Sequence, residues 1–163
     1  MYDLNQQRLA FTDALVNTFF PNCPFSAQSI NLADQSLADE HTDLMNLVSG
    51  ICSITVLGHF NSCQSAQLIL KESRTIVELA PGDVFFFPSA CISHSSAPMV
   101  SEDDKRKSFI MYSAGGLFRW VHQGHKLAKE GPQLSPAEAR AEGAIRWENG
   151  WKLFSNIKEF RSL

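Results

Sequence analysis

The sequence is poor in cysteine, and its few cysteines are not spaced for a cysteine-rich site. The four, at positions 23, 52, 63 and 91, include no Cys-x-x-Cys pair, which argues against a zinc knuckle or a thioredoxin-type redox motif. Cys52 and Cys91 fall in strand-like segments, where a free thiol serves as a small apolar core residue. We therefore expect an intracellular protein, nuclear or cytoplasmic, whose cysteines stay reduced.

Long apolar runs and a strong excess of one charge are also absent. No apolar stretch approaches the roughly 20 residues that a membrane-spanning helix needs, and Met1-Tyr2-Asp3 leads into a polar run instead of a signal peptide. Lys and Arg total 14, and Asp and Glu total 17, for a net charge of -3. We expect no membrane contact. The lack of a basic field weakens a nucleic-acid-binding role without excluding it, because a local groove can still be basic.

What the sequence does contain is typical of an ordered globular protein. Hydrophobic residues make up 44% of the chain and charged residues 19%. A chain of 163 residues favours one domain and buries on the order of 70% of its extended surface. We expect a helical lead-in over residues 1–24, a β core over 25–121 and a helical extension over 122–163.

Short strand patterns between glycine and proline turns dominate the middle of the chain. They cover residues 51–57, a hairpin over 67–79, residues 84–87 after a Pro-Gly-Asp turn, residues 106–113 and, more weakly, 26–32. Because residues 84–87 are apolar throughout, we expect both faces of that strand to be buried. Many short strands with such turns predict a mainly β protein, and the double-sheet jelly roll (double-stranded β-helix) is the natural candidate.

Helical patterns flank these strands. Apolar residues recur about every 3.6 positions over residues 4–19, which predicts a short N-terminal helix. Ser135-Pro136-Ala137-Glu138 has the form of a capping box with proline at the first helical position, so a helix should begin there and run to about Glu142. Trp147 and Trp151 belong to a final amphipathic segment, and we expect these C-terminal helices to pack on the sheet with the aromatics in the core.

Two short motifs in the β core combine into a candidate metal site. His41 and Asp43 are two residues apart, so an extended backbone points both side chains to one side. His94 closes a second strand pattern after Pro88, where a buried imidazole is costly unless it is hydrogen-bonded or ligated. Each motif alone is common, but two imidazoles and one carboxylate on one face are the ligand set of non-haem iron(II) with open positions.

Arg106 and Ser108 supply the complement to such a site. In an alternating strand they share a face, and we expect that strand to neighbour the one that carries His94. The planar guanidinium of arginine binds a carboxylate in bidentate fashion, and a serine hydroxyl on the same face adds a hydrogen bond. The pattern therefore indicates a site for one iron(II) ion and one dicarboxylate.

The residues that carry a family resemblance extend beyond these motifs. They are His41-Thr42-Asp43 with Asn46-Leu47, residues 51–58, residues 81–84, residues 88–95, residues 106–121, and the tail from Trp147 to Ser155. Together they resemble the iron(II)/2-oxoglutarate-dependent dioxygenases, in particular the TET/JBP-like branch found in basidiomycete fungi. The resemblance covers the chain from about residue 25 to the end. It implies a double-stranded β-helix in which His41, Asp43 and His94 bind iron(II), and Arg106 with Ser108 binds 2-oxoglutarate.

The resemblance also implies an activity. Such enzymes hydroxylate a substrate with dioxygen and release succinate and CO₂ from 2-oxoglutarate, and TET and JBP relatives act on the methyl group of a pyrimidine in nucleic acid. A methylated base of the 5-methylcytosine or thymine type is therefore the first expected substrate, with Asn46 and Ser96 as candidate substrate contacts. The candidate basic contacts to nucleic acid are Lys105, Lys107, Arg119, Lys126 and Lys129.

Two alternatives stay open. The same chemistry on a small molecule or a protein side chain is slightly favoured by the acidic balance of the chain. A non-catalytic, cupin-like binding module is the other alternative, although an intact set of ligands argues against it. Relatives often carry Gly-Gly where this chain has Ser65-Ala66, and the chain has little room for the insertions with which larger relatives bind DNA. These two differences from the relatives affect the expected substrate more than the expected cofactor chemistry.

Overall fold

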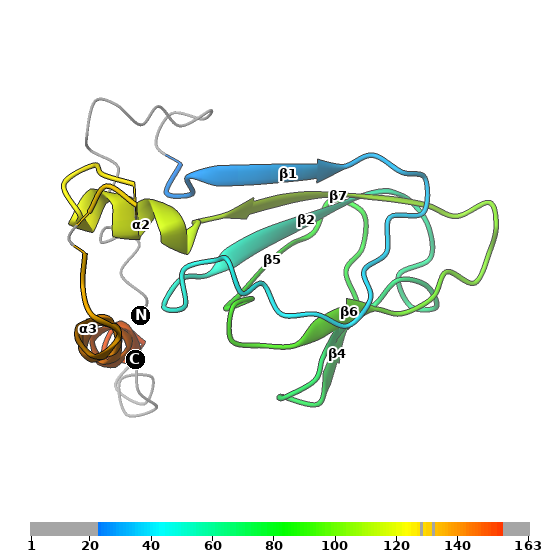
Figure 1. Cartoon of the computed structure of the whole chain (residues 1–163). Helices are drawn as coiled ribbons and strands as arrows, with labels where there is room; N and C mark the ends of the chain where they lie inside the picture. The colour runs from blue at the N-terminus through cyan, green and yellow to red at the C-terminus, as the bar shows by residue number, and fades with distance from the viewer. Residues whose placement is uncertain (1–22, 128, 132, 155–163) are drawn as a thin grey trace.

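A computed structural model of the chain describes residues 23–127, 129–131 and 133–154. Within these ranges, strands β1 to β7 form two antiparallel sheets that lie one above the other (Figure 1). This two-sheet arrangement is a jelly-roll-like fold, so the predicted mainly β fold class is confirmed. The helix predicted over residues 4–19 lies outside the described residues.

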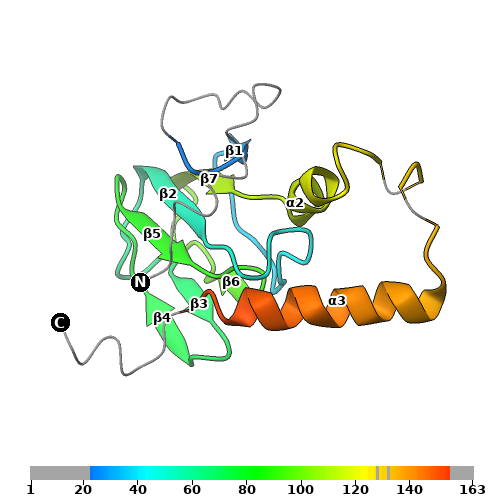
Figure 2. The same ribbon diagram turned by 90° about the vertical axis from the view of Figure 1, so that its left-hand side faces the viewer.

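The two sheets differ in size and in the strands they take from the chain. The larger sheet has the order β1 (Ala27–Asn31), β7 (Lys105–Tyr112), β2 (Cys52–His59) and β5 (Val84–Phe87). The smaller has the order β4 (Thr75–Val77), β3 (Leu68–Leu70) and β6 (His94–Ser96), and it is best seen in Figure 2. Strands far apart in the chain, such as β1 and β7, are thus neighbours in space.

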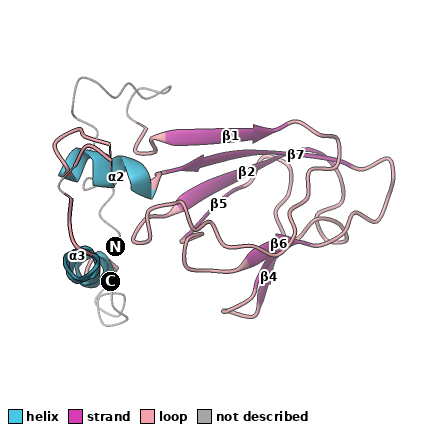
Figure 3. Cartoon of the chain, in the orientation of Figure 1, coloured by secondary structure: helices cyan, strands magenta, loops and turns pink. Residues whose placement is uncertain are grey.

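Two helices lie at one end of the strands (Figure 3), α2 (Gly115–His122) and α3 (Pro136–Trp151). The capping box at Ser135 is confirmed, but the helix that it starts continues past Glu142 to Trp151. Trp147 and Trp151 are 61% and 47% exposed, so the expectation that they belong to the core is wrong. They pack on each other instead, with ring centroids 5.7 Å apart. Among the described residues, neither helix has the length and hydropathy of a membrane-spanning segment.

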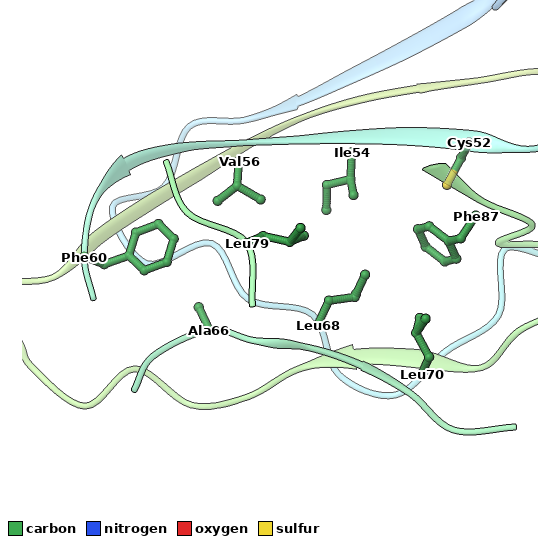
Figure 4. Close-up of a cluster of buried hydrophobic side chains, with 9 residues drawn as sticks. All are labelled: Cys52, Ile54, Val56, Phe60, Ala66, Leu68, Leu70, Leu79 and Phe87. Carbon is green, nitrogen blue, oxygen red and sulfur yellow. The ribbon is translucent and has the colours of Figure 1, made fainter. Parts of the chain in front are cut away.

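The hydrophobic core lies between the two sheets (Figure 4). Its buried members are Cys52, Ile54, Val56, Phe60, Ala66, Leu68, Leu70, Leu79 and Phe87. Alternate residues of β2 at positions 52, 54 and 56 point into this layer, because side chains along a strand alternate with period 2. The predicted core role of Cys52 is confirmed, and Cys91 is only half-buried.

Strand β5 departs from the sequence prediction that both of its faces are buried. Val84 and Phe86 are 49% and 54% exposed, whereas Phe87 is buried. The reason is that the larger sheet is antiparallel and packs only one of its faces on the core, so the alternate residues of β5 face away from the second sheet. Among the described strands β5 pairs with β2 alone, at the edge of the sheet.

Strand β6 also departs from prediction, and this changes how the site is assembled. Residues 89–91 form a turn, and the amides of Cys91 and Ile92 donate to the Pro88 carbonyl. β6 therefore begins at His94 instead of ending there. β6 belongs to the smaller sheet and β7 to the larger one. The expectation that Arg106 lies on the strand next to His94 is therefore wrong, because the two residues come from opposite sheets.

Candidate metal centre

The structure brings His41, Asp43 and His94 together. The amide of His41 donates to the His94 carbonyl (3.0 Å), and the amide of His94 donates to the His41 carbonyl (2.9 Å). Two residues that exchange both hydrogen bonds lie directly opposite each other in an antiparallel pair, with side chains on the same side. One potential ligand atom from each of the three side chains lies within 4.8 Å of the other two.

Backbone carbonyls orient both imidazoles. His41 Nδ1 lies 2.7 Å from the Asp39 carbonyl oxygen, and His94 Nδ1 lies 2.9 Å from that of Ile92. A carbonyl oxygen can only accept, so in the neutral form of each imidazole Nδ1 carries the hydrogen and Nε2 keeps its lone pair. The Phe87 ring packs against the His94 ring in a T-shaped arrangement, with the ring centroids 4.9 Å apart, and further confines it. Imidazoles that donate Nδ1–H to a fixed acceptor are typical of metal ligands, and this donor set fits a metal ion.

The carboxylate of Asp43 is held from behind. Asn46 Nδ2 donates to Asp43 Oδ2 (3.1 Å) and to Ser89 Oγ (3.1 Å), while the Asp43 amide donates to the Ser89 carbonyl (3.0 Å). The other carboxylate oxygen, Oδ1, lies 3.4 Å from His41 Nε2. One oxygen of Asp43 is thus engaged by the protein, and the other faces the two imidazoles.

A cavity of about 140 Å³ opens beside these three residues, between the two sheets. The candidate ligands line it together with Arg106, Ser108 and Ser96, whereas Asn46 is not part of its lining. An engineered cavity of about 150 Å³ in another protein binds benzene, so this volume suits a small ligand.

Arg106 brings an unpaired cation to the cavity. The residue is 3% exposed, its Nη1 donates to the Ser36 carbonyl, and its Nε has no hydrogen-bond partner. Within the described ranges no carboxylate forms an ion pair with it. Burial lowers the pKa of the guanidinium, but arginine remains protonated in proteins. A buried charge is costly without a partner, so the cavity is suited to an anion.

Ser108 lies beside Arg106 on the same face of β7, as predicted. It is buried, and its Oγ accepts a hydrogen bond from Asn31 Nδ2 on β1 (2.9 Å). On the neighbouring strand β2, Gly58 lies opposite Arg106. A Cβ atom at Gly58 would lie 2.0 Å from the Lys105 carbonyl oxygen, so only glycine allows the two strands to approach this closely.

The basic residues proposed to contact nucleic acid do not gather at one place. Lys105 and Lys107 both lie against Asp34, at 2.9 and 3.8 Å, and Lys105 above all lowers the pKa of that carboxyl. Arg119 belongs to α2, which follows the other end of β7, and Lys126 and Lys129 come after that helix.

Asn31, Ser36 and Ser89 are among the residues that hold the site and were not predicted from the sequence. Each acts through a contact between segments far apart in the chain, and two of them contribute a backbone carbonyl, which leaves no trace in residue type. The only local signal for Asn31 is its place in the weak strand pattern over residues 26–32.

Comparison with known proteins supports the fold. No protein-family model matches the chain, and no curated protein sequence matches it. The structure is similar to that of NgTET1 in complex with 5mC DNA, with a TM-score of 0.54 and 19% identity over 69% of this chain. It also matches an RmlC-like cupin protein from Desulfovibrio desulfuricans, with a TM-score of 0.33 and 12% identity over 61% of this chain and 92% of that one. The match covers 41% of the NgTET1 chain, and at this identity it shows a shared jelly-roll-like fold.

Proposed function

We propose that the chain is an iron(II)- and 2-oxoglutarate-dependent dioxygenase. His41, Asp43 and His94 hold the iron(II), and Arg106 and Ser108 bind the distal carboxylate of 2-oxoglutarate. The observation that carries the proposal is that the three candidate ligands and a buried, unpaired arginine line one cavity. Two imidazoles and one carboxylate leave open positions on iron(II) for a bidentate cosubstrate and dioxygen, and the bound iron would supply the oxidising chemistry.

The residues around the cavity bind, orient and exclude water. The carbonyls of Asp39 and Ile92 keep Nε2 of each histidine available, and Asn46 keeps one oxygen of Asp43 turned away. Apolar side chains, among them Leu68 and Phe87, line the cavity wall. Such a wall keeps water away and strengthens an arginine–carboxylate pair, because Coulomb attraction increases as the dielectric constant falls.

A methylated base in nucleic acid is the first candidate substrate. Its support is the motif resemblance to the TET/JBP-like branch and the fold shared with NgTET1, which was solved in complex with 5mC DNA. A base in a duplex would have to be flipped out, because its methyl group is out of reach within the stack. Hydroxylation of that methyl group would be coupled to conversion of 2-oxoglutarate and dioxygen into succinate and CO₂.

A small molecule or a protein side chain is the second candidate. Its support is that Lys105 and Lys107 are paired with Asp34 and that the net charge of the chain is -3. A polyanion gains little from such a surface, because its affinity rests mainly on cations that neutralise phosphates.

The test is succinate formation by iron(II)-loaded protein in air. We expect wild-type protein to produce succinate, His94→Ala to produce none, and His59→Ala, a histidine at the end of β2 that does not line the cavity, to match wild type. Stimulation by a methylated single-stranded oligonucleotide, but not by its unmethylated twin, would support the first substrate class. No succinate from folded wild-type protein under any of these conditions would contradict the proposal and favour a binding module.

A further inference from the structure

The hydrogen bond from Asn31 determines the role of the Ser108 hydroxyl as an acceptor or a donor. The two residues are register partners in the β1–β7 pair, and Asn31 Nδ2 lies 2.9 Å from Ser108 Oγ. An amide NH₂ group can only donate, so the serine oxygen must accept. The single hydroxyl hydrogen of Ser108 then points elsewhere, and no hydrogen bond of the described residues uses it.

Both residues line the cavity, next to Arg106. Ser108 and Arg106 are buried, so neither can satisfy its donors with bulk water. A serine hydrogen and a guanidinium presented side by side match the two oxygens of a carboxylate. A Ser108 hydroxyl turned the other way would present a lone pair to that carboxylate and repel it.

We propose that Asn31 is a positioning residue that fixes Ser108 as a hydrogen-bond donor to the distal carboxylate of the cosubstrate. The inference rests on the proposed function, because the ligand is 2-oxoglutarate bound through its other end at the metal. Asn31 acts through Ser108, so its contribution disappears when the serine hydroxyl is absent.

A double-mutant cycle tests this dependence. The measured quantity is the dissociation constant of 2-oxoglutarate for iron(II)-loaded protein without oxygen. We expect Ser108→Ala to raise it about 10-fold or more, as for a lost hydrogen bond to a charged group, and Asn31→Ala to raise it by a smaller factor. In the Ser108→Ala background, Asn31→Ala should add nothing. If the two effects multiply in full, Asn31 acts independently and the proposal is wrong.

A second variant tests the direction of the hydrogen bond. Asn31→Asp is nearly isosteric but can only accept when ionised, so it draws the Ser108 hydrogen away and adds negative charge near the carboxylate. We expect affinity for 2-oxoglutarate to fall about 10-fold or more, while affinity for pyruvate, which lacks the distal carboxylate, is unchanged. The matched control is Gln28→Glu, the same change on the opposite face of β1, away from the cavity. If Asn31→Asp lost the same factor of affinity for 2-oxoglutarate and for pyruvate, the substitution would have damaged the site in general, and the proposal would be contradicted.

The outcomes separate this inference from the function on which it rests. If folded, iron(II)-loaded wild-type protein binds no 2-oxoglutarate, the proposed function fails and the role of Asn31 fails with it. If the wild type binds 2-oxoglutarate, and Asn31→Ala and Asn31→Asp each bind it as tightly as the wild type does, only the role of Asn31 is refuted.

Discussion

Arg106 is a buried cation whose Nε has no hydrogen-bond partner among the described residues. It forms no ion pair with any of the described carboxylates, and it lines the cavity. We expect Arg106→Ala to raise the dissociation constant of 2-oxoglutarate about 100-fold, because truncating one partner of a buried charge pair typically costs about 2–5 kcal/mol. Anaerobic titration measures it, with Arg119→Ala on α2 as the control. Unchanged affinity in protein that still binds iron(II) would remove Arg106 from the cosubstrate site.

Cys52 should make the stability of the protein fall at alkaline pH. Burial raises the pKa of its thiol to about 11, and in the unfolded chain the thiol ionises near its ordinary value of about 9. Below pH 9 both states are protonated. As pH rises from 9 towards 11 only the unfolded state loses the proton, so the free energy of unfolding falls by about 2 kcal/mol. Urea unfolding across this range should show a shallower fall for Cys52→Ala, and identical slopes would contradict the assigned cause.

The site residues that could be predicted from the sequence are those that lie two positions apart in an extended segment. His41 with Asp43, and Arg106 with Ser108, share a face in any extended segment, so the sequence alone pairs them. Asn31 could not be predicted, because its contact with Ser108 depends on the register of β1 on β7. A one-residue shift of that register would turn Asn31 to the other face.

Strands β2 and β7 approach each other closely at Gly58, which lies opposite Arg106. Gly58 has φ +125°, and an added Cβ would meet the Lys105 carbonyl. We expect Gly58→Ala to lower the free energy of unfolding by about 3 kcal/mol, since it combines a strained backbone with a steric clash. The control is Gly124→Ala, because Gly124 also has positive φ (+66°) but open space at its Cβ position, and there we expect about 1 kcal/mol. If denaturant unfolding showed the same loss of stability for Gly58→Ala and Gly124→Ala, the close approach of β2 and β7 would not contribute to the cost of the Gly58 substitution.

Helix α3 depends on its first turn more than on the β core. Ser135 Oγ accepts from the Glu138 amide, Glu138 Oε2 accepts from the Ser135 amide, and the helix buries no side chain. We expect Ser135→Ala to weaken the first turn by about 1 kcal/mol. Faster amide exchange in α3, without exchange changes in β2, would reveal this local loss. Ser135→Asp should retain slow exchange, and slow exchange in Ser135→Ala would contradict the role of the cap.

The same Ser135 contacts lower the pKa of the Glu138 carboxyl. A lowered pKa in the folded state contributes stability above the ordinary carboxyl pKa, and that contribution is lost as pH falls through the lowered one. As pH falls through the lowered pKa of Glu138, the first turn of α3 should therefore lose protection against amide exchange. We expect this loss of protection to be larger in the wild type than in Ser135→Ala.

Elements were predicted well where the pattern is local and poorly where it depends on neighbours. The capping box of α3 and the alternation of β7 are visible in the sequence alone. The edge position of β5 is not, because an apolar run looks the same in a central strand and in an edge strand. The assignment of β6 to the smaller sheet likewise depends on pairing with β3, which no local pattern specifies.

At the scale of the whole molecule, the candidate site joins the two sheets. His94 comes from the smaller sheet and Arg106 from the larger, and the hydrophobic core fills the same interior layer. The jelly-roll class could be predicted because many short strands with tight turns leave few other arrangements. The distribution of the site residues over the two sheets could not be predicted, since it depends on crossovers between strands that are distant in sequence.

A ligand that bridges both sheets should stabilise the whole fold. Under the proposed function, iron(II) with 2-oxoglutarate binds the native state only, so at a ligand concentration about 100 times the dissociation constant it should add about 2.7 kcal/mol to the free energy of unfolding. Thermal melts without oxygen should show a higher Tm with both ligands than with iron(II) alone. No difference in Tm would contradict a shared binding site.

Anaerobic titration of apoprotein with iron(II) and then 2-oxoglutarate tests the central claim most directly. We expect the weak visible charge-transfer band of an iron(II)–2-oxoglutarate chelate to appear at one equivalent of each. It should be absent from His94→Ala and present in His59→Ala. If folded wild-type protein shows no such band, His41, Asp43 and His94 do not form an iron(II) site for 2-oxoglutarate, and the proposed activity is wrong.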